Sequence, residues 1–223
     1  MFVGHLAVAL ASKRVNPRAS LGWYVAGVTT LDLIWPILLI LGVEHASIVP
    51  GATAFNALVF DSYPWSHSLL MSIVWGALLA GLARWAGVDA RACMLIGACV
   101  LSHWVLDWIT HTADLPLWPG NSPRFGLGLW NSVPGTFAVE GALWVFGLTL
   151  YLQHRRSSGW VGRVAFWSLV LLCTVMWAAG PWSPPPPSTT ALGWFALIGW
   201  IVVPWAAWAD RNYQETAVEA VTS

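Results

Sequence analysis

Long apolar runs separated by short polar segments form the basic pattern of this chain. A helix that spans a membrane needs about 20 mostly apolar residues. The runs of this length are Ala19–Gly42, Ser66–Gly87, Ala92–His111, Pro134–Gln153, Val161–Gly180 and Thr189–Ala209. The opening stretch Phe2–Ala11 is too short to cross, so we expect a half-helix or an interfacial helix there. The pattern therefore predicts an all-α fold: a polytopic transmembrane helical bundle with about six spanning helices.

The composition agrees with this prediction and excludes other classes of protein. Charged residues make up 9% of the 223 positions and hydrophobic residues 57%, whereas a soluble domain carries roughly 25% charged residues. The abundance of apolar side chains excludes a disordered chain, and a net charge of zero argues against a nucleic-acid partner. We expect residues 1–210 to form a single transmembrane domain and residues 211–223 a short polar cytoplasmic tail.

The basic residues predict the orientation of the spans. If the segment after the opening stretch is cytoplasmic, nine lysines and arginines fall on that side and only Arg124 falls on the other. Cytoplasmic segments of membrane proteins carry such an excess. We therefore expect a protein of the bacterial cytoplasmic (inner) membrane, with the loops Val43–Trp65 and Thr112–Val133 facing the periplasm.

A stripe of ionisable residues in the third run points to a metal site. His103, Asp107 and His111 recur every four residues and so share one face of a helix. Two imidazoles and a carboxylate are ligands that Zn²⁺ accepts. The alternative interpretation is a polar stripe that joins helices through hydrogen bonds.

Three further residues could join this stripe from other segments. His67 begins a span on the outer side, and His5 reaches the same level if the opening segment is a half-helix. Asp32 lies in mid-span, where a carboxylate must pair, bind a cation or be protonated. The predicted ligands of a divalent metal, with Zn²⁺ as the expected ion, are His5, Asp32, His67, His103, Asp107 and His111.

The remaining candidate residues concern catalysis and substrate binding. Glu140 is an isolated acid inside its span and is the first candidate for a general acid or base, acting beside Asp107. A glycine-rich loop carries Arg124, Gly126 and Gly128. Arginine and the exposed N–H groups of such a loop can bind a phosphate, so we expect substrate binding there.

Several of these motifs together resemble the bacterial membrane-bound metal-dependent hydrolases, which are grouped distantly with the zinc-dependent phospholipase C helical fold. The resemblance covers residues 1–145. It implies a metal site formed by His5, Asp32, His67, His103 and Asp107. The motifs that carry it are Gly4-His5, Asp32, Tyr63-Pro-Trp-Ser-His67-Ser-Leu-Leu, His103-Trp-Val-Leu-Asp107, Asp114–Gly120 and Gly126–Trp130.

The chain departs from the pattern of these hydrolases at two places. Many members carry a proline-aspartate-x-aspartate stretch, whereas Asp32 stands without a preceding proline or a second acid. Many also carry a second histidine shortly before the one that matches His67, and here those positions are Asp61-Ser62-Tyr63. A second metal ion would need Asp61 to replace the missing ligand.

The sequence thus predicts metal-assisted hydrolysis at an outward-facing site, acting on a phosphoester or on a lipid-linked substrate. The expected partner is a membrane lipid or a lipid-linked small molecule, and the sequence allows a homo-oligomer. Two alternatives use the same residues. A transporter or channel would pass protons or metal ions along them, although the cytoplasmic half of the spans offers few acids. A non-catalytic membrane scaffold would use them only to join helices.

Overall fold

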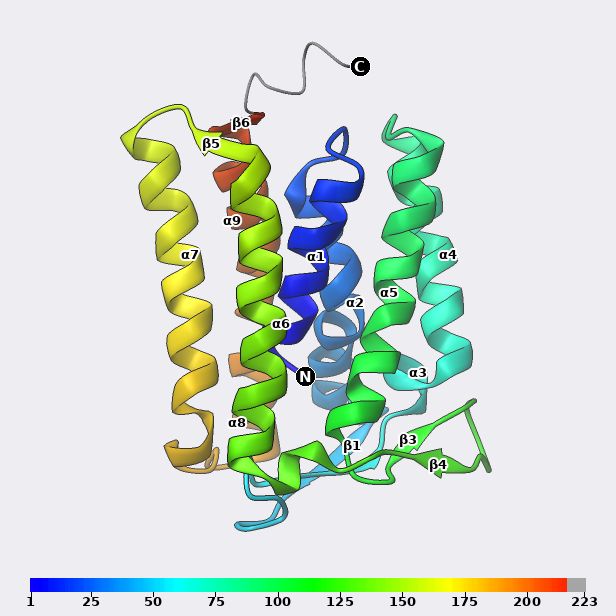
Figure 1. The fold of residues 1–223 in the computed structure, drawn as a ribbon. Helices are drawn as coiled ribbons and strands as arrows, with labels where there is room; N and C mark the ends of the chain where they lie inside the picture. The colour runs from blue at the N-terminus through cyan, green and yellow to red at the C-terminus, as the bar shows by residue number, and fades with distance from the viewer. Residues whose placement is uncertain (216–223) are drawn as a thin grey trace.

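The computed structural model describes residues 1–215, which form a bundle of helices that run roughly along one axis (Figure 1). The helices are α1 (Val3–Val15), α2 (Leu21–Ile40), α3 (Pro64–His67), α4 (Leu69–Trp85), α5 (Ala90–Thr110), α6 (Val133–His154), α7 (Trp160–Ala179), α8 (Thr189–Ala196) and α9 (Gly199–Arg211). The predicted all-α polytopic bundle is confirmed.

Five segments among the described residues are long and apolar enough to cross a membrane. They are α2, α5, α6, α7 with its terminal turn, and α8 together with α9. The remaining predicted run, Ser66–Gly87, is shorter than expected, because Ser68 is extended and separates the turn α3 from α4. The 17 residues of α4 span roughly 25 Å at about 1.5 Å per residue.

Many large apolar side chains on the outside of the bundle are exposed. Leu78 is 57% exposed, and Val145 and Leu171 are each 64% exposed. Such a surface is costly in water and favourable against lipid chains. The exposed surface therefore agrees with a bundle that lies in a membrane.

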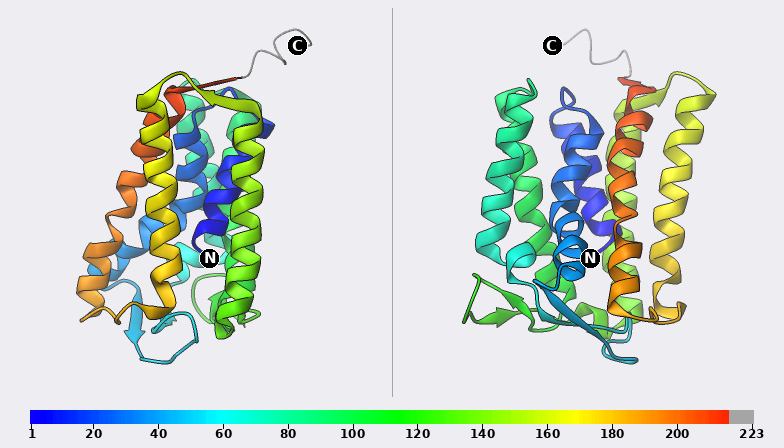
Figure 2. Two further views of the ribbon diagram at one scale, coloured as in Figure 1. Left: turned by 60° about the vertical axis from the view of Figure 1, so that its left-hand side comes forward. Right: turned by 180° about the vertical axis from the view of Figure 1, so that it is seen from behind.

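The opening segment is a half-helix inside the bundle and not an interfacial helix. Helix α1 packs against α2, α5 and α6, and its first residues lie at mid-depth (Figures 1 and 2). Gly147 of α6 permits this contact, because a Cβ atom there would lie 2.6 Å from the carbonyl oxygen of Ala7. At its other end, α1 is held by a buried ion pair of 2.9 Å between Lys13 and Asp210 of α9.

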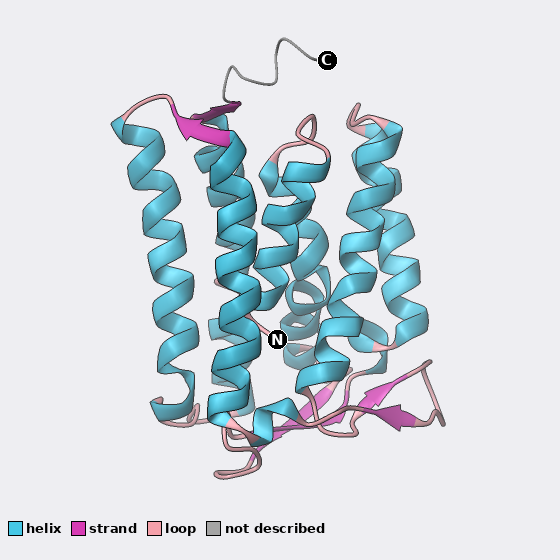
Figure 3. Ribbon diagram, in the orientation of Figure 1, coloured by secondary structure: helices cyan, strands magenta, loops and turns pink. Residues whose placement is uncertain are grey.

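Short two-stranded antiparallel sheets cover the two ends of the bundle (Figure 3). At one end, β1 (His45–Ile48) pairs with β2 (Leu58–Ser62), and β3 (Leu115–Pro116) pairs with β4 (Arg124–Phe125). At the other end, β5 (Arg155–Ser157) pairs with β6 (Tyr213–Glu215). Part of the predicted polar tail therefore forms β6, and residues 216–223 lie outside the described residues.

Candidate metal centre

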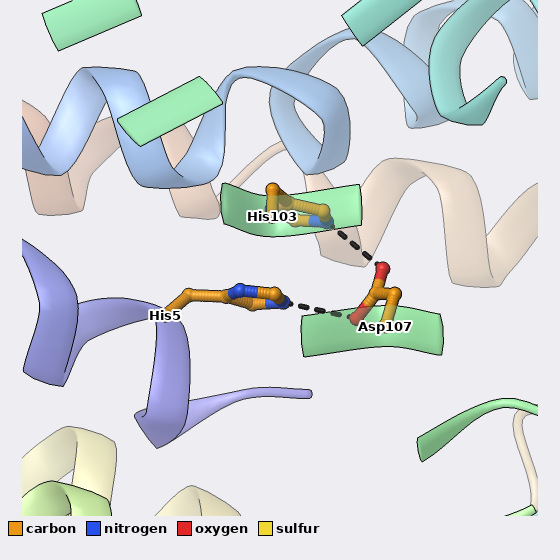
Figure 4. Close-up of side chains that lie close together, drawn as sticks. All are labelled: His5, His103 and Asp107. Atoms are coloured by element: carbon orange, nitrogen blue, oxygen red, sulfur yellow. Dashed lines mark hydrogen bonds and ion pairs between the residues drawn. The ribbon is translucent and has the colours of Figure 1, made fainter. Parts of the chain in front are cut away.

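Asp107 of α5 is the centre of a buried cluster of imidazoles near the end of the bundle that carries β1–β4. The Nε2 atom of His103 lies 3.0 Å from Asp107 Oδ2, and that of His5 lies 3.1 Å from Oδ1 (Figure 4). Nε2 of His111 and of His67 lie 3.7 and 3.9 Å from Oδ2. The structure thus brings together four histidines that the sequence predicted as ligands.

Asp32 of α2 completes this cluster from the opposite side. Its Oδ1 atom lies 3.5 Å from Nε2 of His67 and 3.8 Å from Nε2 of His103. Its side chain is 49% exposed, whereas that of Asp107 is 3% exposed. Asp32 is therefore the carboxylate of the cluster that is open to approach from outside.

The other ring nitrogen of His103 has a partner that fixes its protonation. Nδ1 lies 2.6 Å from the carbonyl oxygen of Val28 in α2. A carbonyl only accepts hydrogen bonds, so Nδ1 carries the proton and donates it. In the neutral ring, Nε2 then carries a lone pair that faces the carboxylates of Asp107 and Asp32.

His67 is oriented by a chain of two hydrogen bonds that ends at a buried acid, Glu44. The Ser66 hydroxyl donates to Glu44 Oε2 at 2.6 Å, and its oxygen lies 2.7 Å from Nδ1 of His67. Because its only proton is used toward Glu44, the hydroxyl accepts from Nδ1–H. Glu44 also accepts the backbone N–H groups of Trp65 and Ser66, both at 2.8 Å. In the neutral ring, Nε2 of His67 then carries a lone pair that faces the cluster.

His111 is held in the same way at the end of α5. Its Nδ1 lies 3.0 Å from Oδ1 of Asp114, which also accepts a hydrogen bond from the Tyr63 hydroxyl. Burial raises the pKa of the Tyr63 phenol well above its usual range, and the charge of Asp114 adds to this effect. The tyrosine therefore stays a donor, and Nδ1–H of His111 donates to the carboxylate.

Three imidazoles thus share one arrangement: Nδ1 donates to a second group, and Nε2 faces a carboxylate. Lone pairs that point at carboxylate oxygens repel them unless a proton or a metal cation lies between. A second group on the far ring nitrogen is typical of histidines that bind metal ions. Two sets of potential ligand atoms each lie within 4.8 Å of one another, namely His5/His103/Asp107 and Asp32/His67/His103. The donor set fits a divalent ion such as Zn²⁺.

His5 differs from the other imidazoles. Its ring stacks on His103 with centroids 3.8 Å apart and planes 6° from parallel (Figure 4). Its Nδ1 is buried without a hydrogen-bond partner among the described residues. Its orientation therefore depends on the stacking and on Asp107.

Glu140 of α6 lies beside the cluster and is hydrogen-bonded to the start of α1. Its Oε2 accepts the backbone N–H groups of Phe2 at 2.8 Å and Gly4 at 3.4 Å. Its Oε1 is buried and has no partner among the described residues. The amino group of Met1 forms an ion pair with Asp107, so a positive charge lies against that carboxylate here.

A cavity of about 240 Å³ opens from the cluster toward the hairpin end. Its polar side is formed by acids and imidazoles of the cluster, and its other walls are largely aromatic. The lining includes Asp32, His67, Asp107, His111, Glu140, Trp35, Phe55, Phe60 and Trp130. A small polar group of a ligand can therefore reach the cluster.

A family model described as YdjM inner membrane protein matches residues 1–181. The chain belongs to this family. The match includes every residue of the cluster described above. No curated protein and no solved structure matches the chain. Together with the apolar spans, membership in the YdjM family identifies an integral inner-membrane protein. The family's description says nothing of hydrolysis.

The glycine-rich loop of this YdjM-family protein holds the end of α5. Leu127 and Gly128 donate their N–H groups to the carbonyls of Trp108 and His111, at 2.8 and 2.6 Å. Gly126 allows this approach, because a Cβ atom there would lie 1.7 Å from the carbonyl oxygen of Thr112. The loop's role toward a substrate stays a prediction.

Two polar residues of the hairpins lie apart from the cluster. The exposed Arg124 donates to the backbone carbonyl of Asp61 at 3.0 Å. The Asp61 carboxylate accepts a hydrogen bond of 2.6 Å from Ser47. Arg124, like Gly126 and Gly128, is not among the residues that line the cavity. Asp61 therefore does not stand where it would replace a missing metal ligand.

Sequence reasoning missed the groups that orient the imidazoles. Glu44 is fully buried, yet it lies in a polar loop, and no spacing connects it with Ser66. The carbonyl of Val28 is a backbone group, so no side-chain motif could have indicated it. The only available signal was the pair Ser66-His67 itself, because a serine beside a histidine can accept from its ring.

Proposed function

We propose that this inner-membrane protein is a metal-dependent hydrolase that acts on a phosphoester or lipid-linked substrate. One observation carries the proposal: three imidazoles with occupied Nδ1 atoms direct Nε2 at the buried carboxylate of Asp107, next to a cavity. The resemblance to membrane-bound metal-dependent hydrolases supports it, because that resemblance rests on the same residues.

The proposed ligands are the residues whose free ring nitrogens and carboxylate oxygens meet. His67, His103, Asp107 and Asp32 would hold the ion, with His111 and His5 close to the same oxygens of Asp107. When bound, Zn²⁺ supplies Lewis acidity toward water and toward an oxygen of the scissile group.

Glu140 is the residue suited to move the proton. One of its oxygens is held by backbone N–H groups, and the other has no partner among the described residues and is free to accept. As the oxygen of an attacking water bonds to phosphorus, Glu140 takes the water's proton and the bond to the leaving-group oxygen breaks. Glu140 then returns the proton to that oxygen.

The proposed orientation places the cluster on the periplasmic side. Its support is the distribution of charge: Arg124 lies at the hairpin end that carries the cluster, and the other lysines and arginines belong to segments near the opposite end. Accessibility of a cysteine introduced at Asp61 to a membrane-impermeant thiol reagent in intact cells, measured against the wild type with its three buried cysteines, tests this orientation. Labelling only after the membrane is opened would contradict it.

Elemental analysis of detergent-purified protein tests the metal centre. We expect near-stoichiometric Zn²⁺ in the wild type and its loss in the double variant His103→Ala/Asp107→Ala. The matched control is His45→Ala/Asp61→Ala, which removes the same two residue types from exposed positions of the β1–β2 hairpin. Absence of metal after reconstitution of a folded wild type would refute the centre and the hydrolase with it.

The rival function is transport of protons or metal ions through the same acids. Against it stands a layer of buried apolar side chains on α1 and α2 beyond the cluster, which includes Leu6, Leu10 and Val25. Uptake driven by a proton gradient in vesicles, abolished by Asp32→Asn, would favour transport instead.

A further inference from the structure

A second and larger hollow adjoins the cavity of the metal centre. Its volume is about 940 Å³, and its walls come from the end of α7, from α8 and from residues 50–58. Phe55, Asn56, Leu58 and Gly180 line both this groove and the smaller cavity, so the two adjoin. The groove is therefore a continuation of the space in front of the cluster.

The sequence explains why α7 and α8 stand apart at this end. The run Pro184–Pro187 cannot continue a helix, so the chain leaves α7 in an extended segment before Ser188 caps α8. Helix α8 then packs on α2, where a Cβ at Gly193 would lie 2.8 Å from Ile40. Helix α9, beyond the break at Leu197, packs on α7. In Figure 2, α8 leans away from α7 toward the hairpin end.

The groove is apolar and borders the lipid-facing surface. Val175 and Met176 of α7 and Phe195 of α8 line it, and they are 54%, 41% and 58% exposed. These side chains belong to two membrane-spanning segments. The groove therefore opens between two spans, where the neighbouring molecules are lipids.

We propose that this groove binds the hydrocarbon chain of a phosphorylated membrane lipid whose head group enters the cavity of the metal centre. The proposal rests on the proposed function for the head group. Its own support is the continuity of an apolar hollow with a polar one, which matches a molecule with an apolar tail and a charged head. A lipid chain in the membrane is already out of water, so moving it into the groove gains little from the hydrophobic effect. The groove therefore orients the lipid and selects for its chain more than it adds to binding affinity.

Phe55 lies at the junction of the two hollows. Its ring packs edge-on against Phe137, with centroids 5.9 Å apart, and it lies over Gly180, where a Cβ would be 3.2 Å from the ring. Both hollows are lined by Phe55. In the proposed complex this ring contacts the lipid where the head group meets the chain.

Filling the groove separates its role from that of the metal centre. Ala179 lines the groove and is not among the residues that line the cavity, so Ala179→Trp obstructs the chain while leaving the cluster intact. Leu171→Trp is the matched control, because Leu171 lies on the same helix, faces outward at 64% exposure and does not line the groove.

The assay compares two phosphomonoesters, long-chain phosphatidic acid in mixed micelles and soluble p-nitrophenyl phosphate, with zinc content measured in parallel. We expect Ala179→Trp to lower kcat/KM for phosphatidic acid at least tenfold and to leave p-nitrophenyl phosphate and zinc content unchanged. The control should change neither rate. An unchanged rate with phosphatidic acid, or an equal loss with both substrates, would overturn the lipid groove.

A binding measurement distinguishes failure of the groove from failure of the hydrolase. Phosphatidic acid with a diazirine in its acyl chain is photo-crosslinked to the wild type, to Ala179→Trp and to His103→Ala/Asp107→Ala, and the sites are mapped by mass spectrometry. Crosslinks at Val175, Met176 or Phe195 that Ala179→Trp removes support the groove even if no substrate is hydrolysed. Their absence from a zinc-loaded wild type would overturn the groove alone.

Discussion

The hydroxyl of Ser66 provides the sharpest test of the proposed metal centre. Ser66→Ala removes the acceptor of His67 Nδ1 and the donor that lies 2.6 Å from Glu44. Glu44 keeps its two backbone donors at 2.8 Å, so the loop retains most of its anchoring. Nothing else in the cluster is altered.

The expected effects have two separate magnitudes. Loss of a group that orients a metal-binding histidine typically weakens metal affinity about 10–100-fold, which corresponds to roughly 1.4–2.7 kcal/mol. Loss of a buried hydrogen bond to a carboxylate lowers the free energy of unfolding by about 1.5–3 kcal/mol. Zinc affinity is measured by competition with a chelating indicator, and stability by unfolding in detergent.

The neighbouring Ser68 offers a matched control. It is equally buried, and its hydroxyl accepts the N–H of Met71 as the cap of α4. Ser68→Ala should cost about 0.5–2 kcal/mol of stability through the lost cap while leaving zinc affinity unchanged. If the Ser66 and Ser68 variants bind zinc equally well, Ser66 does not set the lone pair of His67 and the argument about its ring nitrogen is wrong.

Three further predictions concern other parts of the molecule. Lys13→Met removes one of two cationic partners of the buried Asp210 carboxylate, which keeps Arg155 at 3.4 Å, so we expect a loss in detergent unfolding below the roughly 3–5 kcal/mol of a fully unpaired buried charge, with zinc content unchanged; loss of zinc would contradict a purely structural role of the pair. Gly126→Ala places a methyl group against the Thr112 carbonyl, and we expect roughly 1–3 kcal/mol of destabilisation, measured against Gly159→Ala, which meets open space at an extended φ of 176°. Zinc at a hundred times its Kd should raise the free energy of unfolding of the apo wild type by about 2.7 kcal/mol and leave that of His103→Ala/Asp107→Ala unchanged. Equal increases in both proteins would place the metal elsewhere.

The sequence predicted the bundle and the gathering of histidines with Asp32 and Asp107, because both leave strong local signals. Apolar runs indicate the spans. An ionisable side chain is costly to bury in a membrane, so its presence within a span indicates a partner or a functional site. The sequence predicted six full spans. One of them is shortened because Ser68 is extended, and this conformation depends on the loop that packs around it. Whether α1 is a half-helix was open, since only the contact of Ala7 with Gly147 decides it. Glu44 was missed because its partners, Trp65 and Ser66, lie in α3 and are brought to it by the β1–β2 hairpin, whose register no sequence pattern predicts.

Helix α1 carries a consequence for the order in which the protein is made. The half-helix supplies His5 to a cluster that also contacts Glu140, and it is surrounded by α2, α5 and α6, the last of which ends at His154. At about 5–20 residues per second, synthesis from α1 to the end of α6 takes on the order of ten seconds. During that interval α1 is too short to cross the membrane and lacks α6, the last of its neighbours to be made. Its docking is therefore a late step of biogenesis, and the proposed metal centre would be complete only after the newly made chain has inserted as far as α6.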